Sequence, residues 1–209
     1  MQARRAQLSL GRLALLMAVS LLATARLGQA AALAPRLSLE TMAREADLVV
    51  VGRSTTSTSR WFQGNLLTFA PIEVAEIWKG TQGAKVTVVL PGGMDSSGPI
   101  PLAQDVPGAP TLQPGEEVLL FLRRVDPLPA GLPPCYTILG FGQGKFSIRR
   151  QGGKAIASQN LSGVGLVDGS RVSPGALTER SLESLRDQLR SLFVPQSAAP
   201  QPPSDTRPQ

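Results

Sequence analysis

Paired carboxylates are the catalytic groups that this sequence offers. Its 209 residues include no histidine and one cysteine, so the usual His/Cys zinc sites and the Ser-His-Asp and Cys-His nucleophilic sites are excluded. Two carboxylates can hydrolyse a glycoside without histidine. The pairs close in sequence are Glu116 with Glu117, Glu73 with Glu76, and Asp95 with Asp105. Adjacent glutamates point to opposite faces of a strand, which disfavours Glu116 with Glu117 as a catalytic pair.

Asp95 and Asp105 are also the candidates for a metal site. They lie in a long segment, 91–115, together with Ser96, Ser97 and many backbone carbonyls, and calcium accepts such hard oxygen ligands. Their spacing matches no calcium loop, so an ordinary polar loop is the favoured interpretation and we expect no metal site. A carboxylate-based or metal-loop hydrolase of the cell envelope is the alternative function.

The motifs of serine nucleophiles and of cofactor sites are missing. The S-x-x-K and G-x-S-x-G patterns do not occur. Gly163-Val164-Gly165 begins like a dinucleotide-binding loop, but Asp168 stands where the third glycine should be. We therefore expect no catalytic residue and no cofactor.

Two neighbouring aromatic residues are more informative, because aromatics make up only 4% of the chain. Trp61 and Phe62 lie in an otherwise polar connection. Aromatic residues are enriched at recognition surfaces, although these two could instead fold back and close one end of a barrel. Together with Met94 and Asp95, they are the candidate contacts for a binding partner.

The N-terminus has the layout of a secretory signal peptide. Residues 1–12 carry three arginines and no acidic residue, and 13–25 form an apolar run that is short for a membrane-spanning helix. We predict a signal peptide over residues 1–30, cleaved after Ala30 or earlier after Ala25. The chain is then secreted or periplasmic, with no stable membrane span after cleavage.

Cleavage changes what the charge implies. The formal net charge of +6 falls to about +2, because four arginines and no acid leave with the signal. A nucleic-acid partner is therefore not expected, since such proteins carry a clustered basic surface. Cys135 is the only cysteine, so an internal disulfide is impossible. It is either a buried thiol or a residue that pairs between chains.

The elements that must position these residues are mostly strands. Apolar spacing predicts a helix over 39–46 capped by Ser38 and a C-terminal helix that ends near Phe193 and is capped by Thr178. The segment 91–115 is rich in proline and glycine and predicts no regular structure. The predicted strands are 48–52, 66–78 with a β-bulge near Ala75, 85–90, 116–125, 136–140, 145–150 and 154–159.

This pattern predicts a mainly β fold. Several short strands, one of them strongly bent, suggest a small OB-like closed or partly open β-barrel, with a short N-terminal helix and a C-terminal helix. The folded domain is expected over residues 31–194. A proline-rich tail, 195–209, has almost no apolar bulk and is expected to be disordered.

Three segments resemble a known class of domain. The sequences ADLVVVG at 46–52, IEVAEIWKG at 72–80 and GEEVLLFL at 115–122 are similar to those of bacterial exported domains that resemble the OB-fold of the tissue inhibitor of metalloproteinases and netrin-like class. The resemblance implies a barrel and an extracytoplasmic binding role. Inhibitors of that class bind the protease zinc through an N-terminal cysteine. Here the expected mature N-terminus is alanine, so that mechanism is not implied for this chain.

The sequence as a whole favours an exported, non-enzymatic binding module that recognises a protein or cell-envelope component through its barrel loops. The candidate contacts are Trp61, Phe62, Met94 and Asp95. A structural partner of a protease or secretion system is a further possibility, and the hydrolase is the competing class.

Overall fold

The computed structural model of the protein describes residues 32–127 and 130–193. The predicted signal peptide, 1–30, and the predicted tail, 195–209, lie outside the described residues. The described part is mainly β, with a closed five-stranded barrel and a C-terminal helix. The predicted fold class is therefore confirmed.

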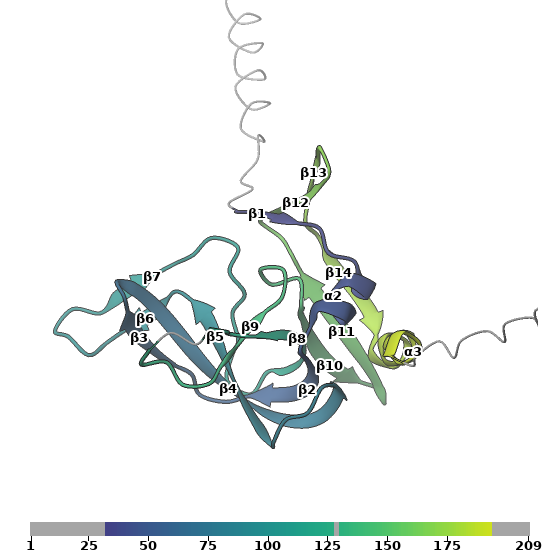
Figure 1. The fold of residues 1–209 in the computed structure, drawn as a ribbon, viewed down its shortest axis with the longest axis horizontal. Helices are drawn as coiled ribbons and strands as arrows, with labels where there is room; N and C mark the ends of the chain where they lie inside the picture. The colour runs from purple at the N-terminus through teal and green to yellow at the C-terminus, as the bar shows by residue number, and fades with distance from the viewer. Residues whose placement is uncertain (1–31, 128–129, 194–209) are drawn as a thin grey trace, which may run out of the picture. The chain divides into compact units, whose positions relative to one another are not determined.

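The barrel is a ring in which each strand pairs with the next. In order around the ring, β2 pairs with β4, β4 with β5, β5 with β9, β9 with β8, and β8 with β2 again (Figure 1). The β5–β9 pair is parallel and the other four pairs are antiparallel. The strands are β2 (Leu48–Ser54), β4 (Asn65–Lys79), β5 (Lys85–Pro91), β8 (Glu117–Arg124) and β9 (Tyr136–Ile138).

Strand β2 is buried on both faces, which explains its unbroken apolar run. Leu48 and Val50 point into the barrel, where they pack with residues of β4, β5 and β8. Val49 and Val51 point the other way, into a second core that the helices cover. β8 alternates between the same two cores. Both β2 and β8 therefore contribute buried side chains to each of the two cores.

The second core lies between a sheet and two helices. From β8 the sheet continues through β10 (Lys145–Gln151) and β11 (Lys154–Asn160) to the edge strand β14 (Leu177–Ser181). Helices α2 (Leu39–Glu45) and α3 (Leu182–Phe193) supply apolar side chains to this core. Neither helix of the described part is long and apolar enough to cross a membrane.

Both ends of α2 have identifiable partners. Ser38 caps α2 as predicted, because its Oγ accepts a hydrogen bond from the backbone N–H of Thr41 at 3.1 Å. The Lys79 ammonium donates to three carbonyls at the other end of α2. The prediction that Thr178 caps the C-terminal helix is wrong. Thr178 lies in β14, and the helix begins at Leu182.

Strand β4 contains the predicted β-bulge. Its pairing with β2 skips Ala75 between Val74 and Glu76, and it skips Trp78 a little further on. Each skipped residue lets the strand bend and twist. A single strand of 15 residues can therefore pair with both β2 and β5 and curve around the barrel.

The structure adds strands that the sequence did not predict. The expectation that 91–115 has no regular structure is wrong, because β6 (Gly93–Asp95) and β7 (Leu102–Gln104) form a two-stranded antiparallel ribbon. The segment before Trp61 is also a strand, β3 (Thr58–Phe62), paired with β4. A separate three-stranded sheet contains β1 (Ala32–Pro35), β12 (Val164–Asp168) and β13 (Arg171–Pro174).

Gly52 in β2 provides a test of the packing between β2 and β4. A Cβ atom at Gly52 would lie 2.5 Å from the Glu73 carbonyl oxygen and 2.7 Å from Ile72 Cγ2. We expect Gly52→Ala to lower the free energy of unfolding by about 1–3 kcal/mol, the usual cost of overpacking a core. Chemical denaturation measures this change.

Gly83→Ala is the matched control. A Cβ at Gly83 would meet no atom within 4 Å, so its effect should stay within about 0.5 kcal/mol. Equal stability of the two variants would show that β2 and β4 do not approach as closely as described.

Candidate functional site

Three of the four predicted contact residues lie close together. Trp61 is near the end of β3, and its indole Nε1 donates a hydrogen bond to Asp95 Oδ2 at 2.7 Å. Met94 precedes Asp95 in β6, and its backbone N–H donates to Ser59 Oγ at 3.3 Å. The ribbon β6–β7 therefore lies against β3. The Trp61 side chain is 47% exposed, so it does not plug the barrel.

Phe62 is separated from this group. Successive residues of a strand point to opposite faces, so Phe62 points away from the face that carries Trp61. It is half-buried and lies opposite Asn65 in the pairing of β3 with β4. By the same rule Met94 and Asp95 point to opposite faces of β6, so Asp95 shares a face with Trp61 while Met94 lines the groove described below. Phe62 is the one of the four predicted residues that lies at neither place.

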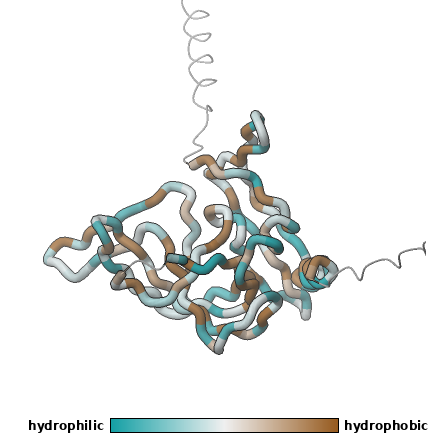
Figure 2. Tube along the Cα trace, in the orientation of Figure 1, coloured by the Kyte–Doolittle hydropathy of each residue, from teal (hydrophilic) through white to brown (hydrophobic). Residues whose placement is uncertain are grey.

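The ribbon contributes two apolar residues that the sequence analysis missed. Ile100 is 73% exposed and Leu102 is 54% exposed. Met94, on the paired strand, is 61% exposed, and apolar stretches of the ribbon are brown in Figure 2. The signal was the sequence Pro99-Ile100-Pro101-Leu102, in which apolar residues interrupt a polar loop. We call Trp61, Met94, Ile100 and Leu102 the ribbon patch.

A groove of about 680 Å³ adjoins the ribbon patch. Met94 and Ala103, which pair across the ribbon, both line it. Leu90 and Leu112 give it an apolar part, while Ser59 and Thr68, joined by a 2.9 Å hydrogen bond, add hydroxyl groups. The two strands of the ribbon thus form one wall of a groove next to the barrel.

Asp95 is held in its charged form. Hydrogen bonds from Ser97 are the main reason that its pKa is lowered, and the bond from Trp61 lowers it further. The carboxylate is therefore ionised at neutral pH and keeps an acceptor in place for the indole N–H. This contact fixes the orientation of an exposed aromatic ring.

Other carboxylates are held by cations and donors. Glu76 accepts hydrogen bonds from Trp78 and Arg186, and the Trp78 bond is the larger cause of its lowered pKa. Glu116 is partly buried, which by itself raises its pKa, but hydrogen bonds from Lys145 and Ser147 lower it overall. A general acid of a glycosidase needs a raised pKa, and these shifts have the opposite sign.

The positions considered for metal binding do not form a cluster. Among the residues described, no group of three or more Cys, Asp or Glu side chains is placed to hold a metal ion. Asp95 is engaged by Trp61 and Ser97. Asp105 lies beyond the end of β7, on the wall of the groove.

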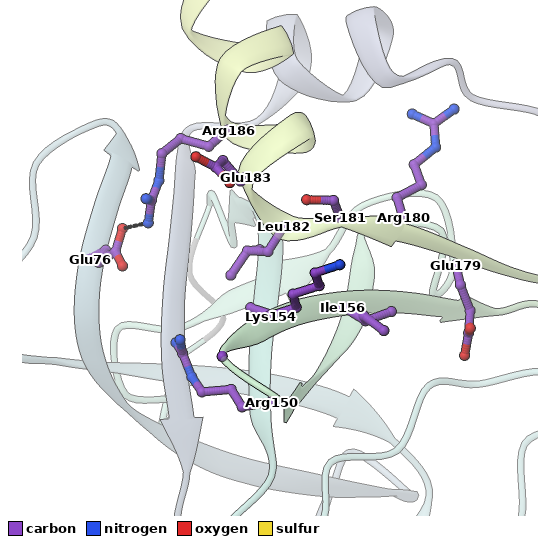
Figure 3. A pocket seen from close by; sticks show the side chains of 12 residues that line it. Glu76, Arg150, Lys154, Ile156, Glu179, Arg180, Ser181, Leu182, Glu183 and Arg186 are labelled. Atoms are coloured by element: carbon purple, nitrogen blue, oxygen red, sulfur yellow. Dashed lines mark hydrogen bonds and ion pairs between the residues drawn. The ribbon is translucent and has the colours of Figure 1, made fainter.

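A second cavity, of about 740 Å³, lies between β4, the β10–β11 hairpin, β14 and the start of α3. In Figure 3, Glu76 and Arg186 form an ion pair on one side of the cavity. Arg150 and Lys154 come from the hairpin, and Leu182 lies between the ion pair and Lys154. Basic and acidic side chains both line this cavity. Because neither charge dominates, its lining favours no ligand of a single charge.

Cys135 is buried at 1% exposure, just before β9. Burial raises the pKa of its thiol, with a smaller opposing effect from Arg60. A thiol with a raised pKa is a poor nucleophile at neutral pH. These properties agree with a buried, unreactive thiol rather than with a residue that pairs between chains.

Comparison with known proteins identified no matching family model, no similar curated protein and no similar solved structure.

The Glu116 contacts predict a specific dependence of stability on pH. Glu116 accepts hydrogen bonds from Lys145 Nζ at 2.8 Å, Ser147 Oγ at 2.6 Å and the Gln113 N–H at 3.0 Å. Because folding lowers its pKa from 4.5, its contribution is present above about pH 4.5 and is lost as the pH falls through the folded value. Glu116→Gln should cost about 1–3 kcal/mol at pH 7 and flatten the loss of stability in acid.

Unfolding curves measured from pH 7 to pH 3 check both expectations. Glu73→Gln is the control, since Glu73 forms only an exposed ion pair with Lys85 at 3.7 Å, and such pairs contribute at most about 1 kcal/mol. A Glu116→Gln profile parallel to that of the unaltered protein would contradict the assignment.

Proposed function

We propose that this protein is an exported, non-enzymatic binding module that recognises a protein partner through the ribbon patch. The observation that carries the proposal is that four large exposed apolar residues lie on β3 and on the short ribbon beside it. Leu102 shares a face of the ribbon with Asp95, the partner of Trp61, whereas Met94 lies on the opposite face, beside the groove. Scattered exposed apolar residues are ordinary, whereas several on one short ribbon and the strand beside it are typical of an interaction surface. The hydrogen bond to Asp95 adds a preoriented aromatic anchor, which suits the centre of an interface.

The charge of the ribbon favours one kind of partner. The basic residue next to Trp61, Arg60, points to the other face of β3 and stacks on Phe69. The segment 91–115 contains Asp95 and Asp105 but no lysine or arginine. A complementary surface would offer an apolar pocket for Trp61 and the ribbon, with basic residues at its rim. We therefore propose a partner protein with a basic-rimmed apolar pocket.

Binding is favoured over the hydrolase alternative by the state of the carboxylates. Glu76, Asp95 and Glu116 each accept hydrogen bonds that lower the pKa. Glu117 is paired with Arg150, and Glu73 with Lys85. Carboxylates held in this way suit structural and orienting roles better than proton donation.

Location and family enter the proposal as expectations. The predicted signal peptide, 1–30, supports a secreted or periplasmic location. The five-stranded ring supports the resemblance to the OB-fold of the tissue inhibitor of metalloproteinases and netrin-like class. In this proposal the barrel is a scaffold, and the insertions after β2 and β5 supply the binding surface.

The test uses protein purified after secretion of the full-length chain. Envelope proteins retained by the immobilised protein are identified, and the affinity of each purified partner is then measured for the variants. We expect Trp61→Ala to weaken binding about 30-fold, equal to about 2 kcal/mol. Met94→Ser and Leu102→Ser should each weaken it severalfold.

Val172→Ser is the control, because Val172 is also an exposed apolar residue, at 59%, but lies in β13. It should bind the partner as the unaltered protein does. Unchanged affinity in all three ribbon-patch variants, or an equal loss in Val172→Ser, would remove the assignment of the surface.

A further inference from the structure

A polar cavity lies on the other side of the loop 108–111 from the groove beside the ribbon patch. It has a volume of about 360 Å³ and lies between β10, β11 and the loop 108–111. Ser147 and Ser158 are directly paired across β10 and β11, so their side chains share one face of the sheet. The polar side chains that line the cavity are Thr111, Lys145, Ser147, Ser158, Asn160 and Ser162.

The one formal charge among these lining residues is already neutralised. Lys145 Nζ lies 2.8 Å from Glu116 Oε1 and donates a hydrogen bond to the Thr111 carbonyl at 2.5 Å. The cavity therefore offers hydroxyl, amide and ammonium groups for hydrogen bonding, with little net charge. Such a lining suits a neutral ligand with many hydroxyl groups better than an anion.

Phe141 lines the same cavity in an uncommon backbone conformation. Its φ is 52°, and the flanking Gly140 and Gly142 also have positive φ, at 62° and 96°. A bulky residue in the left-handed region is a steric outlier, and such outliers concentrate at binding sites when the surroundings hold them in place.

The group that holds this loop is Gln143, which is 2% exposed. Its Oε1 accepts a hydrogen bond from the Leu37 N–H at 2.8 Å. Its Nε2 donates to the carbonyls of Pro35 at 2.7 Å and Gly140 at 3.0 Å. The buried amide thus ties the Phe141 loop to the end of β1 and to Leu37 beyond it, and it fixes one wall of the cavity.

We propose that this cavity binds a neutral sugar ring. Phe141 provides an aromatic surface for the C–H groups of a pyranose, and the serines, Asn160 and Lys145 bond to its hydroxyls. The volume is within the range of small-molecule pockets. The loop residues 109–111 line both this cavity and the groove beside the ribbon patch. None of the four ribbon-patch residues lines the cavity, so the proposal does not depend on the ribbon patch.

The test titrates the secreted full-length product with glucose and N-acetylglucosamine and follows backbone amide signals by NMR. We expect saturable shifts at Ser158, Asn160 and Phe141 for at least one of the two sugars. Phe141→Asn should weaken binding at least tenfold. Asparagine tolerates positive φ, so this variant removes the ring and keeps the backbone conformation. Its thermal midpoint should fall, because Phe141 also packs against the cluster of Leu161, Val164 and Leu166, and dispersed amide signals at 25 °C verify that it is folded.

Asn65→Ala is the control, since Asn65 is exposed at the start of β4 and should leave the sugar affinity unchanged. Inorganic phosphate is titrated in parallel. The proposal is overturned if neither sugar gives saturable shifts, if phosphate binds more tightly than both, or if Phe141→Asn binds as the unaltered protein does.

Discussion

The central constraint of this fold is that β2 and β8 are buried on both faces. Their alternating side chains fill the barrel on one side and the helix-covered core on the other. A slip of one residue would exchange every inward and outward side chain, so both cores depend on the same register. The bulges at Ala75 and Trp78 let β4 follow this register while it curves toward β5. The insertions that carry the ribbon patch follow β2 and β5, so their starting points are set by the register of the barrel strands.

The parts of the fold that could be predicted are those with strong local patterns. The apolar run at 48–51, the cap at Ser38 and the change of phase near Ala75 are all visible in a few consecutive residues. Strand β1 could not be found in this way, because its four residues are extended only through pairing with β12, more than 120 positions along the chain. Thr178 was misassigned for the same reason, since pairing with β11 places it in a strand.

The candidate site shows a similar division. Trp61 could be predicted as a contact residue because aromatic residues are scarce in this sequence. Its partner Asp95 could not be predicted, because Asp95 lies in a distant segment of the chain. Ile100 and Leu102 could not be predicted. They lie between prolines, and a strand of three residues is too short to show an apolar periodicity. The positive φ of Phe141 could not be predicted from the sequence, apart from its glycine neighbours. The loop is held by hydrogen bonds between Gln143 and residues far away in the sequence, Pro35 and Leu37.

Strand β14 is the exposed edge of the extended sheet, with all five residues accessible to solvent. Such an edge is a template for adding another strand, and sheets commonly protect their edges with charge. In the antiparallel register that would match all five residues with those of a second copy, Glu179 would face Glu179. Like charges directly opposite each other are destabilising. Arg149 of the same chain pairs with Glu179 and weakens this repulsion. The glutamate at the middle of the strand therefore disfavours growth of the sheet by self-addition only in part.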